Sequence, residues 1–290
     1  MTASPAPASP RENLRASGWL LLDMSLNIWA LTIVKAMGAD YPALQLVFLR
    51  ALTGLVLLAP WIWRERRTFG AVDRLGLHAG RVLLSTVTLA TSFYAVARLP
   101  FALFTAINFT RPILLMLMAA LVLQERITRP RWLAAGAGLG GALVAVNPVA
   151  TPPSLSLLAL AVTVVAGTGA VILTRQLRGT PAVVMMAFYT AGLALAALPF
   201  AWVAWRPVPW GDLPLLLAVG LFAQAAQLCF LKAHWLGDAG VLGPVSYASL
   251  VLSGLAGYLV FGEVPTPEML LGAAIIILAA LSLARERRGA

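Results

Sequence analysis

The feature of this sequence that most limits its fold is a series of long apolar runs separated by short polar breaks. Most runs are close to the length of about 20 residues that an α-helix needs to cross the roughly 30 Å hydrocarbon core of a bilayer. The breaks carry glycine, proline or charged residues, which end helices. We read ten runs, which span residues 17–36, 42–63, 75–97, 102–123, 132–147, 154–174, 182–205, 213–234, 240–261 and 269–284.

Composition places these runs in lipid. Hydrophobic residues make up 60% of the 290 residues and charged residues only 11%, whereas a typical soluble domain is about 25% charged. A backbone in lipid must satisfy its own polar groups, which leaves only helices or closed barrels. The runs are too long and too uniformly apolar for barrel strands. The sequence therefore predicts an all-α integral membrane protein with ten transmembrane helices.

The distribution of lysine and arginine predicts the orientation of the chain. With ten spans, the segments on the N-terminal side carry fifteen basic residues, and the opposite side carries only Lys35, Arg98 and Arg206. Basic residues are retained on the cytoplasmic side, so we expect both termini in the cytoplasm and the protein in the cell inner membrane. The net charge of +10 then reflects topology and contact with anionic lipid, and we expect no nucleic-acid partner.

Processing and cofactor signals are sparse. Residues 1–16 are rich in Pro, Ala and Ser, and we expect a disordered cytoplasmic tail there, with a second short tail at 286–290. The first run lacks a clear small-residue cleavage site and is read as an uncleaved span. Cys229 is the only cysteine, which excludes an intrachain disulfide and a thiolate metal cluster. We find no metal-ligand set, no phosphate-binding loop and no catalytic motif, so we expect no metal, no cofactor and no enzyme activity.

An internal repeat is the most informative pattern. Residues 121–128 match residues 259–266 at a constant offset, and each segment ends an apolar run with a glutamate, Glu125 or Glu263, followed three residues later by threonine. We therefore predict two five-helix repeats, 17–149 and 154–285. Because five is odd, the second repeat must be inverted relative to the first, which is a common design of alternating-access transporters.

At this point the sequence resembles the drug/metabolite transporter superfamily, and within it the EamA-type ten-helix proteins. The resemblance rests on the arginine that ends VFLR at 47–50, on FYAVARLP at 93–100, and on the two helix-end glutamates with their threonines; it covers residues 17–285. Gln124 departs from the glycine that often precedes the first glutamate, whereas Gly262 keeps it. The resemblance implies a secondary transporter without ATP, with a central path lined by both halves.

The resemblance also implies the kind of solute. Members that this sequence looks like export amino acids and related metabolites, so we expect an exporter of small polar metabolites. Transport of S-adenosylmethionine, nucleotide sugars or drugs stays open as an alternative, and so do a channel or an intramembrane enzyme. Two fused halves make a monomer sufficient.

Charged residues deep inside the spans are functional candidates, because each costs about 2.5–3.5 kcal/mol at a helix centre. They are Asp23, Arg50, Arg81 and Arg111. Asp23 and Arg81 each lie six residues from the cytoplasmic end of their spans, so they are expected to be able to pair. Arg111 lies near the midplane and is a candidate contact for a substrate carboxylate, while the family resemblance favours a structural role for Arg50. Either backbone carbonyls or an acidic substrate must compensate the net positive interior.

Helical spacing gathers further polar side chains on single faces. The alternative role for such residues is hydrogen bonding between helices, at about 0.6 kcal/mol on average. Glu125 and Glu263, with Arg50, are expected to brace the structure. The candidate substrate-binding and translocation residues are Asp23, Asn27, Arg81, Ser85, Ser92, Asn108, Arg111, Gln224, Gln227, Ser246 and Tyr247.

Overall fold

The computed structural model describes residues 9–38, 40–71, 74–108, 110–111, 114, 117–118, 121, 129–146, 153–177, 179–236, 245 and 248–286. Within these residues the chain is helical and contains no strand. The helices are α1 (Pro10–Ala36), α2 (Ala43–Arg64), the short 3-10 helix η1 (Arg66–Ala71), α3 (Leu75–Val96), α4 (Phe101–Asn108), α6 (Arg129–Val146), α7 (Leu155–Gln176), α8 (Ala182–Val203), α9 (Leu213–Leu236), α11 (Ala248–Phe261) and α12 (Pro267–Glu286).

Six helices, α1, α2, α3, α7, α8 and α9, are long and apolar enough to cross a membrane, and α11 and α12 contain shorter apolar segments. Large apolar side chains cover their outer faces. Leu195, Trp202 and Leu259, for example, are 71%, 78% and 75% exposed. An exposed apolar surface of this extent fits lipid contact. The predicted all-α membrane fold is confirmed, and the count of ten spans stays a prediction.

The first helix is longer than the sequence predicted. Residues 10–16, expected to belong to a disordered tail, form the first turns of α1. The reason is a capping box: the Ser9 side chain accepts a hydrogen bond from the Glu12 N–H, and the Glu12 carboxylate accepts one from the Ser9 N–H. Such reciprocal bonds satisfy two of the free donors at a helix start.

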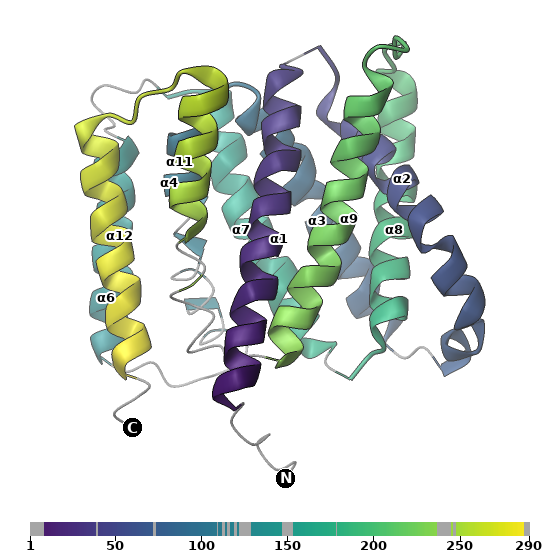
Figure 1. Cartoon of the computed structure of the whole chain (residues 1–290), viewed down its shortest axis with the longest axis horizontal. Coiled ribbons are helices and arrows are strands. Elements are labelled where there is room, and N and C mark those ends of the chain that lie inside the picture. Colours follow the sequence, from purple (N-terminus) through teal and green to yellow (C-terminus); the bar gives the residue numbers. More distant parts are fainter. Residues whose placement is uncertain are drawn as a thin grey trace.

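The helices pack in pairs, and each pair joins one helix from the first half of the chain to one from the second half. α1 packs on α9, α3 on α7, α2 on α8, α4 on α11 and α6 on α12. Figure 1 shows these pairs side by side, from α6 and α12 at one edge, through α4 and α11, to α2 and α8 at the other. The helices of the first half, α1, α2, α3, α4 and α6, correspond in order to α7, α8, α9, α11 and α12. When each helix is replaced by its counterpart, the pair of α1 and α9 becomes the pair of α7 and α3, and the pairs α2–α8, α4–α11 and α6–α12 stay the same. A two-fold relation between the halves produces this exchange.

The pair α2 and α8 shows the likeness of the halves most clearly. Each helix has 22 residues, each has proline as its N-cap residue, and each contains a second proline, Pro60 or Pro199, at its eighteenth residue. The two helices therefore occupy equivalent positions, and they pack directly against each other. They lie where an axis relating the two halves would pass.

The two ends of the bundle can be told apart. The start of α1 and the end of α12 lie at the same end of the molecule (Figure 1). The opposite end holds the C-terminal ends of α1 and α11 and the turn between α8 and α9 (Figure 1). We call this the distal end.

Candidate functional site

The predicted pair of Asp23 and Arg81 does not form. Asp23 is buried in α1, and its carboxylate accepts a hydrogen bond of 2.7 Å from the Asn27 side-chain amide one turn later. Arg81 is buried in α3, where its Nε donates to Thr174 Oγ1 at 2.8 Å and its Nη1 donates to the Met185 carbonyl at 3.1 Å. Asp23 thus accepts from a donor on its own helix, whereas Arg81 donates to oxygen atoms on α7 and α8.

Arg50 and Arg81 approach the same aromatic ring. The guanidinium carbon of Arg81 lies 5.1 Å from the centre of the Tyr189 ring, and that of Arg50 lies 6.0 Å from it. Arg50 Nη1 is buried and has no hydrogen-bond partner among the described residues. Cation–π contact compensates part of the charge of a desolvated guanidinium. Tyr189 was not among the predicted site residues, because an isolated tyrosine in an apolar run has no helical partner that would mark it.

Arg111 extends from the segment after α4 to the backbone of α7. A Cβ atom placed on Gly167 would lie 1.5 Å from Arg111 Nη2, so only a glycine leaves room for the guanidinium. Within the described part of the chain, Arg111 makes no hydrogen bond and no ion pair. Among the described residues, no carboxylate therefore forms an ion pair with Arg111.

The remaining candidates are distributed over several helices. Ser85 and Ser92 are buried on α3, and Gln224 is buried on α9 with Gln227 half-buried one turn away. Asn108, at the end of α4, donates to the Phe104 carbonyl at 2.9 Å, which satisfies its amide within its own helix. Glu125, Ser246 and Tyr247 lie outside the described residues.

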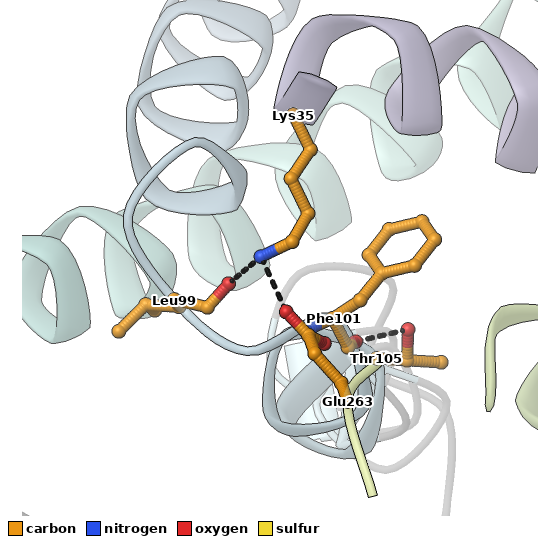
Figure 2. A network of polar contacts seen from close by, with 5 residues as sticks. All are labelled: Lys35, Leu99, Phe101, Thr105 and Glu263. Atoms are coloured by element: carbon orange, nitrogen blue, oxygen red, sulfur yellow. Dashed lines mark hydrogen bonds and ion pairs between the residues drawn. The ribbon is translucent and has the colours of Figure 1, made fainter. Parts of the chain in front are cut away.

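At the distal end, Glu263 joins three segments of the chain (Figure 2). Its carboxylate forms an ion pair of 2.8 Å with Lys35, at the end of α1, and accepts a hydrogen bond of 2.5 Å from the Phe101 N–H, at the start of α4. Lys35 also donates to the Leu99 carbonyl at 2.6 Å and lies 5.1 Å from the centre of the Phe261 ring. We call Lys35, Leu99, Phe101 and Glu263 the distal latch.

A glycine places Glu263 in the latch. Gly262 has a φ of +66° and ends α11, and the N–H of Glu263 returns to the Gly257 carbonyl at 3.1 Å. This is the turn that glycine favours at the end of a helix. The expected bracing role of Glu263 therefore extends beyond its own corner, because the side chain reaches α1 and α4. Thr266, which the repeat also marked, accepts a bond from the Met269 N–H at the start of α12.

A second set of contacts joins the two halves at the distal end beside α2 and α9. The Gln45 side chain pairs with the backbone of Arg206 in both directions, at 2.7 Å and 2.9 Å, and Arg206 Nη1 donates to the Asp40 carbonyl at 2.6 Å. The Tyr41 hydroxyl donates to the Asp212 carboxylate. This hydrogen bond, with smaller contributions from burial and nearby acids, raises the pKa of Tyr41 to about 12.

The sequence contained one clue to these contacts. Lys35, Arg98 and Arg206 are the three basic residues assigned to the non-cytoplasmic side, where lysine and arginine are disfavoured. Two of them, Lys35 and Arg206, join segments distant in the sequence. A cation on the disfavoured side thus indicates a specific contact, although its partner cannot be read from the sequence.

Fold and interior together define a class of protein. A bundle of long apolar helices with exposed apolar faces, and with charged side chains within its spans, is a multi-pass membrane protein with a polar interior. The chain belongs to the EamA-like transporter family, whose family model matches it twice, at residues 16–147 and 154–285.

The named relatives of this chain are metabolite transporters. The chain is 26% identical to an S-adenosylmethionine uptake transporter of Rickettsia conorii, over 91% of this chain and 90% of that one. It is 30% identical to the pseudopaline exporter of Pseudomonas aeruginosa, over 89% and 91% of the two chains. It is 26% identical to a riboflavin transporter of Brucella anthropi, over 86% and 90%. A solved crystal structure shares the fold with a TM-score of 0.66 at 22% identity, over 93% of this chain and 98% of the other.

Proposed function

We propose that this metabolite transporter is a secondary active exporter of amino acids or related small polar metabolites, acting across the cell inner membrane by alternating access. In this proposal the ten spans form two inverted repeats, 17–149 and 154–285, with both termini in the cytoplasm, and one chain is sufficient. The finding that α1 starts and α12 ends at the same end of the bundle supports this topology.

One observation carries the choice of solute. Three arginines and one aspartate lie within the spans, and among the described residues none of them forms an ion pair with another group of the protein. Charge in a low-dielectric interior is stabilised only by an opposite charge or by hydrogen bonds. A carboxylate on the substrate would offset part of the net positive charge of the spans.

The packing pairs support alternating access. The two-fold relation turns the contact of α1 with α9 into the contact of α7 with α3. If the two halves exchange their conformations, the resulting arrangement has equivalent contacts, so we expect it to be similar in free energy. In the present arrangement the latch and the contacts of Gln45 and Tyr41 join the two halves at the distal end. Opening the path on that side must break contacts of this kind.

The names of the relatives leave direction and solute open, since they include both uptake and export. S-adenosylmethionine is itself an amino-acid derivative with a carboxylate, whereas riboflavin has none. Export of amino acids is proposed from the resemblance to amino-acid exporters and from the positive interior. Transport of another metabolite is the second candidate, favoured by the names of the relatives.

The test is counterflow in proteoliposomes. Purified protein is reconstituted, and labelled L-phenylalanine, S-adenosylmethionine and riboflavin are offered separately against an excess of the same unlabelled solute inside. A carrier gives saturable uptake that the internal solute accelerates. Linear uptake without acceleration would indicate a channel, and preference for S-adenosylmethionine or riboflavin over L-phenylalanine would favour the second candidate.

Competition then tests the predicted site. L-Phenylalanine should compete with the transported acid far better than L-phenylalaninamide does, because only the acid offers a carboxylate to the arginines. Arg111→Ala should reduce uptake of the acid roughly tenfold or more, the loss expected for one charge-assisted contact. Equal competition by acid and amide would contradict the carboxylate, and unchanged uptake by the folded variant would remove Arg111 from the site.

A further inference from the structure

Three polar side chains on three different helices point to a binding site that the transporter fold alone does not assign. Arg50 Nη1 on α2, Thr190 Oγ1 on α8 and Gln224 Nε2 on α9 are buried and have no hydrogen-bond partner among the described residues. Thr190 and Gln224 are only 2% and 8% exposed. Buried polar groups are nearly always paired, so each such atom requires an explanation.

The threonine is exceptional within this chain. Every other threonine inside a described α-helix donates to the carbonyl oxygen four residues before it, as Thr53 does on α2 and Thr168 on α7. That local bond is the usual way in which a helix satisfies a threonine hydroxyl. Thr190 lacks it, so its hydroxyl remains available to another group.

The side chains of Thr190 and Gln224 meet beside Gly54 of α2, one turn after Arg50 on the same helix. A Cβ atom placed on Gly54 would lie 2.7 Å from Gln224 Oε1 and 2.9 Å from Thr190 Cγ2, so both side chains reach the same spot on α2. Arg50 lies one turn before Gly54 on the same face of that helix. Its guanidinium also lies 6.0 Å from the ring of Tyr189, the neighbour of Thr190.

This point coincides with the centre of the two-fold relation. Arg50 is the eighth residue of α2 and Tyr189 is the eighth residue of α8, and these helices are equivalent. Equivalent positions can contact each other only close to the axis that relates the halves. In transporters built from inverted repeats, the substrate site lies at the repeat interface near the bilayer midplane.

The chemistry of the cluster selects an anion. A guanidinium, an amide N–H₂ and a hydroxyl can all donate hydrogen bonds, and no carboxylate of the described residues faces them. Arg81, the second cation on the Tyr189 ring, is already bound by Thr174 and by the Met185 carbonyl. Of the two cations on the Tyr189 ring, Arg50 is therefore the one with a buried N–H group that has no partner among the described residues.

We propose that Arg50, Thr190 and Gln224 bind the carboxylate of the transported solute, with Arg50 as an ionic contact in addition to Arg111. Gly54 leaves room for the side chains of Thr190 and Gln224, and the Tyr189 ring holds the Arg50 guanidinium in place while the site is empty. This inference rests on the proposed function and revises the structural role expected for Arg50.

The experiment compares matched solutes on matched variants in proteoliposomes. Wild type, Arg50→Gln, Arg50→Lys, Thr190→Val and the control Arg98→Gln are assayed with labelled L-phenylalanine and S-adenosylmethionine, which carry the carboxylate, and with labelled L-phenylalaninamide and riboflavin, which lack it. Arg98 also lies on a tyrosine ring, 3.9 Å from the centre of Tyr94, and donates to the Tyr94 carbonyl, but it is outside the cluster.

Arg50→Gln should raise the KM of the acids roughly tenfold and change the KM of the other two solutes less than twofold. Arg50→Lys should recover part of the loss, and Arg98→Gln should match wild type. Thr190→Val, which keeps the side-chain shape, should raise the KM of the acids alone, and it serves if Arg50→Gln does not fold. Folded Arg50→Gln and Thr190→Val variants that keep the wild-type preference for acids overturn the inference. A wild-type protein that carries none of the four solutes contradicts the proposed function as well.

Discussion

At the scale of single residues, a substitution at Gly167 can move the Arg111 side chain without changing the stability of the protein. In Gly167→Ala the new Cβ would lie 1.5 Å from Arg111 Nη2. The atom in its way is the far end of a flexible side chain, so the guanidinium moves while the helices keep their packing. We expect the unfolding free energy to change by less than about 0.5 kcal/mol, while uptake of the carboxylate solute falls several-fold.

Gly169→Ala is the matched control for this variant. It lies two residues further along α7 and brings its Cβ within 2.9 Å of a Leu84 methyl group instead. It should leave uptake unchanged. Uptake and thermal unfolding in detergent are measured on both proteins; equal uptake by the two variants would show that the position of Arg111 does not matter.

The Tyr41 hydroxyl should make stability depend on pH at the alkaline end. Its pKa in the folded protein is about 12, above the value of 10.0 for a free tyrosine, chiefly because it donates to Asp212. The folded state thus holds the proton more tightly than the unfolded state, so the stabilisation is complete below pH 10 and disappears as the pH rises through 12.

Tyr41→Phe provides the comparison. The difference in Tm between wild type and Tyr41→Phe should be constant up to about pH 10 and shrink above it, as measured by thermal unfolding in detergent from pH 8 to 12. A difference that stays constant to pH 12 would show that the hydroxyl does not titrate differently in the folded protein.

Residue chemistry explains how far the sequence could predict the site. Apolar runs can be recognised by counting residues, so Asp23, Arg50 and Arg81 could be predicted as charges inside long apolar helices. Neighbours on other helices could not, because periodicity gives the face of a helix and not the helix opposite it. Asp23 and Arg81 were expected to be able to pair but have different partners, and the contact of Tyr189 with Arg50 appears only when α2 and α8 pack together.

At the scale of whole elements, two glycines set the distance between neighbouring helices. A Cβ on Gly192 of α8 would lie 2.5 Å and 2.6 Å from the methyl groups of Val82 on α3, and one on Gly220 of α9 would lie 2.5 Å from the Cβ of Thr53 on α2. These neighbours branch at Cβ and are stiff in a helix, so they cannot turn away.

Gly192→Ala and Gly220→Ala should each lower the unfolding free energy by about 1–3 kcal/mol, the usual cost of overpacking. Gly18→Ala in α1 is the control, since nothing lies within 4 Å of its new Cβ, and it should gain up to about 1 kcal/mol from helix propensity. Chemical unfolding in detergent checks all three. Stability equal to wild type for Gly192→Ala would contradict the close contact of α3 with α8.

The elements were predicted better than their contacts. Apolar length and helix-ending residues placed α2, α3 and α8 within about two residues of their observed bounds, because both are local properties. α1 was predicted too short, since the capping box of Ser9 and Glu12 lies in a polar segment that hydropathy assigns to a tail. The repeat predicted which helices are equivalent, but not that equivalent helices would touch.

At the scale of the whole molecule, the distal latch ties the two halves together by charge. The Lys35 and Glu263 side chains are only 11% and 22% exposed. Removing one partner therefore leaves a charge in poorly solvated surroundings, which costs more than removing both. Lys35→Met and Glu263→Gln should each destabilise the protein, and the double variant should be less destabilised than the sum by about 1–3 kcal/mol.

The double-mutant cycle is measured by unfolding in detergent at neutral pH. Lys232→Met is the control, because Lys232 is exposed and lies 4.3 Å from the centre of the Trp19 ring without an ion pair among the described residues. It should change stability by less than about 0.5 kcal/mol. Strictly additive effects of Lys35→Met and Glu263→Gln would mean that the ion pair does not hold the distal end in solution.

Many of the contacts that close the distal end join a side chain to a main-chain group: Lys35 to the Leu99 carbonyl, Glu263 to the Phe101 N–H, and Gln45 to the backbone of Arg206. A main-chain group is present whatever amino acid occupies its position. In a saturation mutagenesis experiment, tolerance should therefore be one-sided, with Lys35, Gln45 and Glu263 restricted and Leu99 free to vary among residues of similar size. Homologues can therefore vary the sequence of the turns at this end and still form the hydrogen bonds that join its segments.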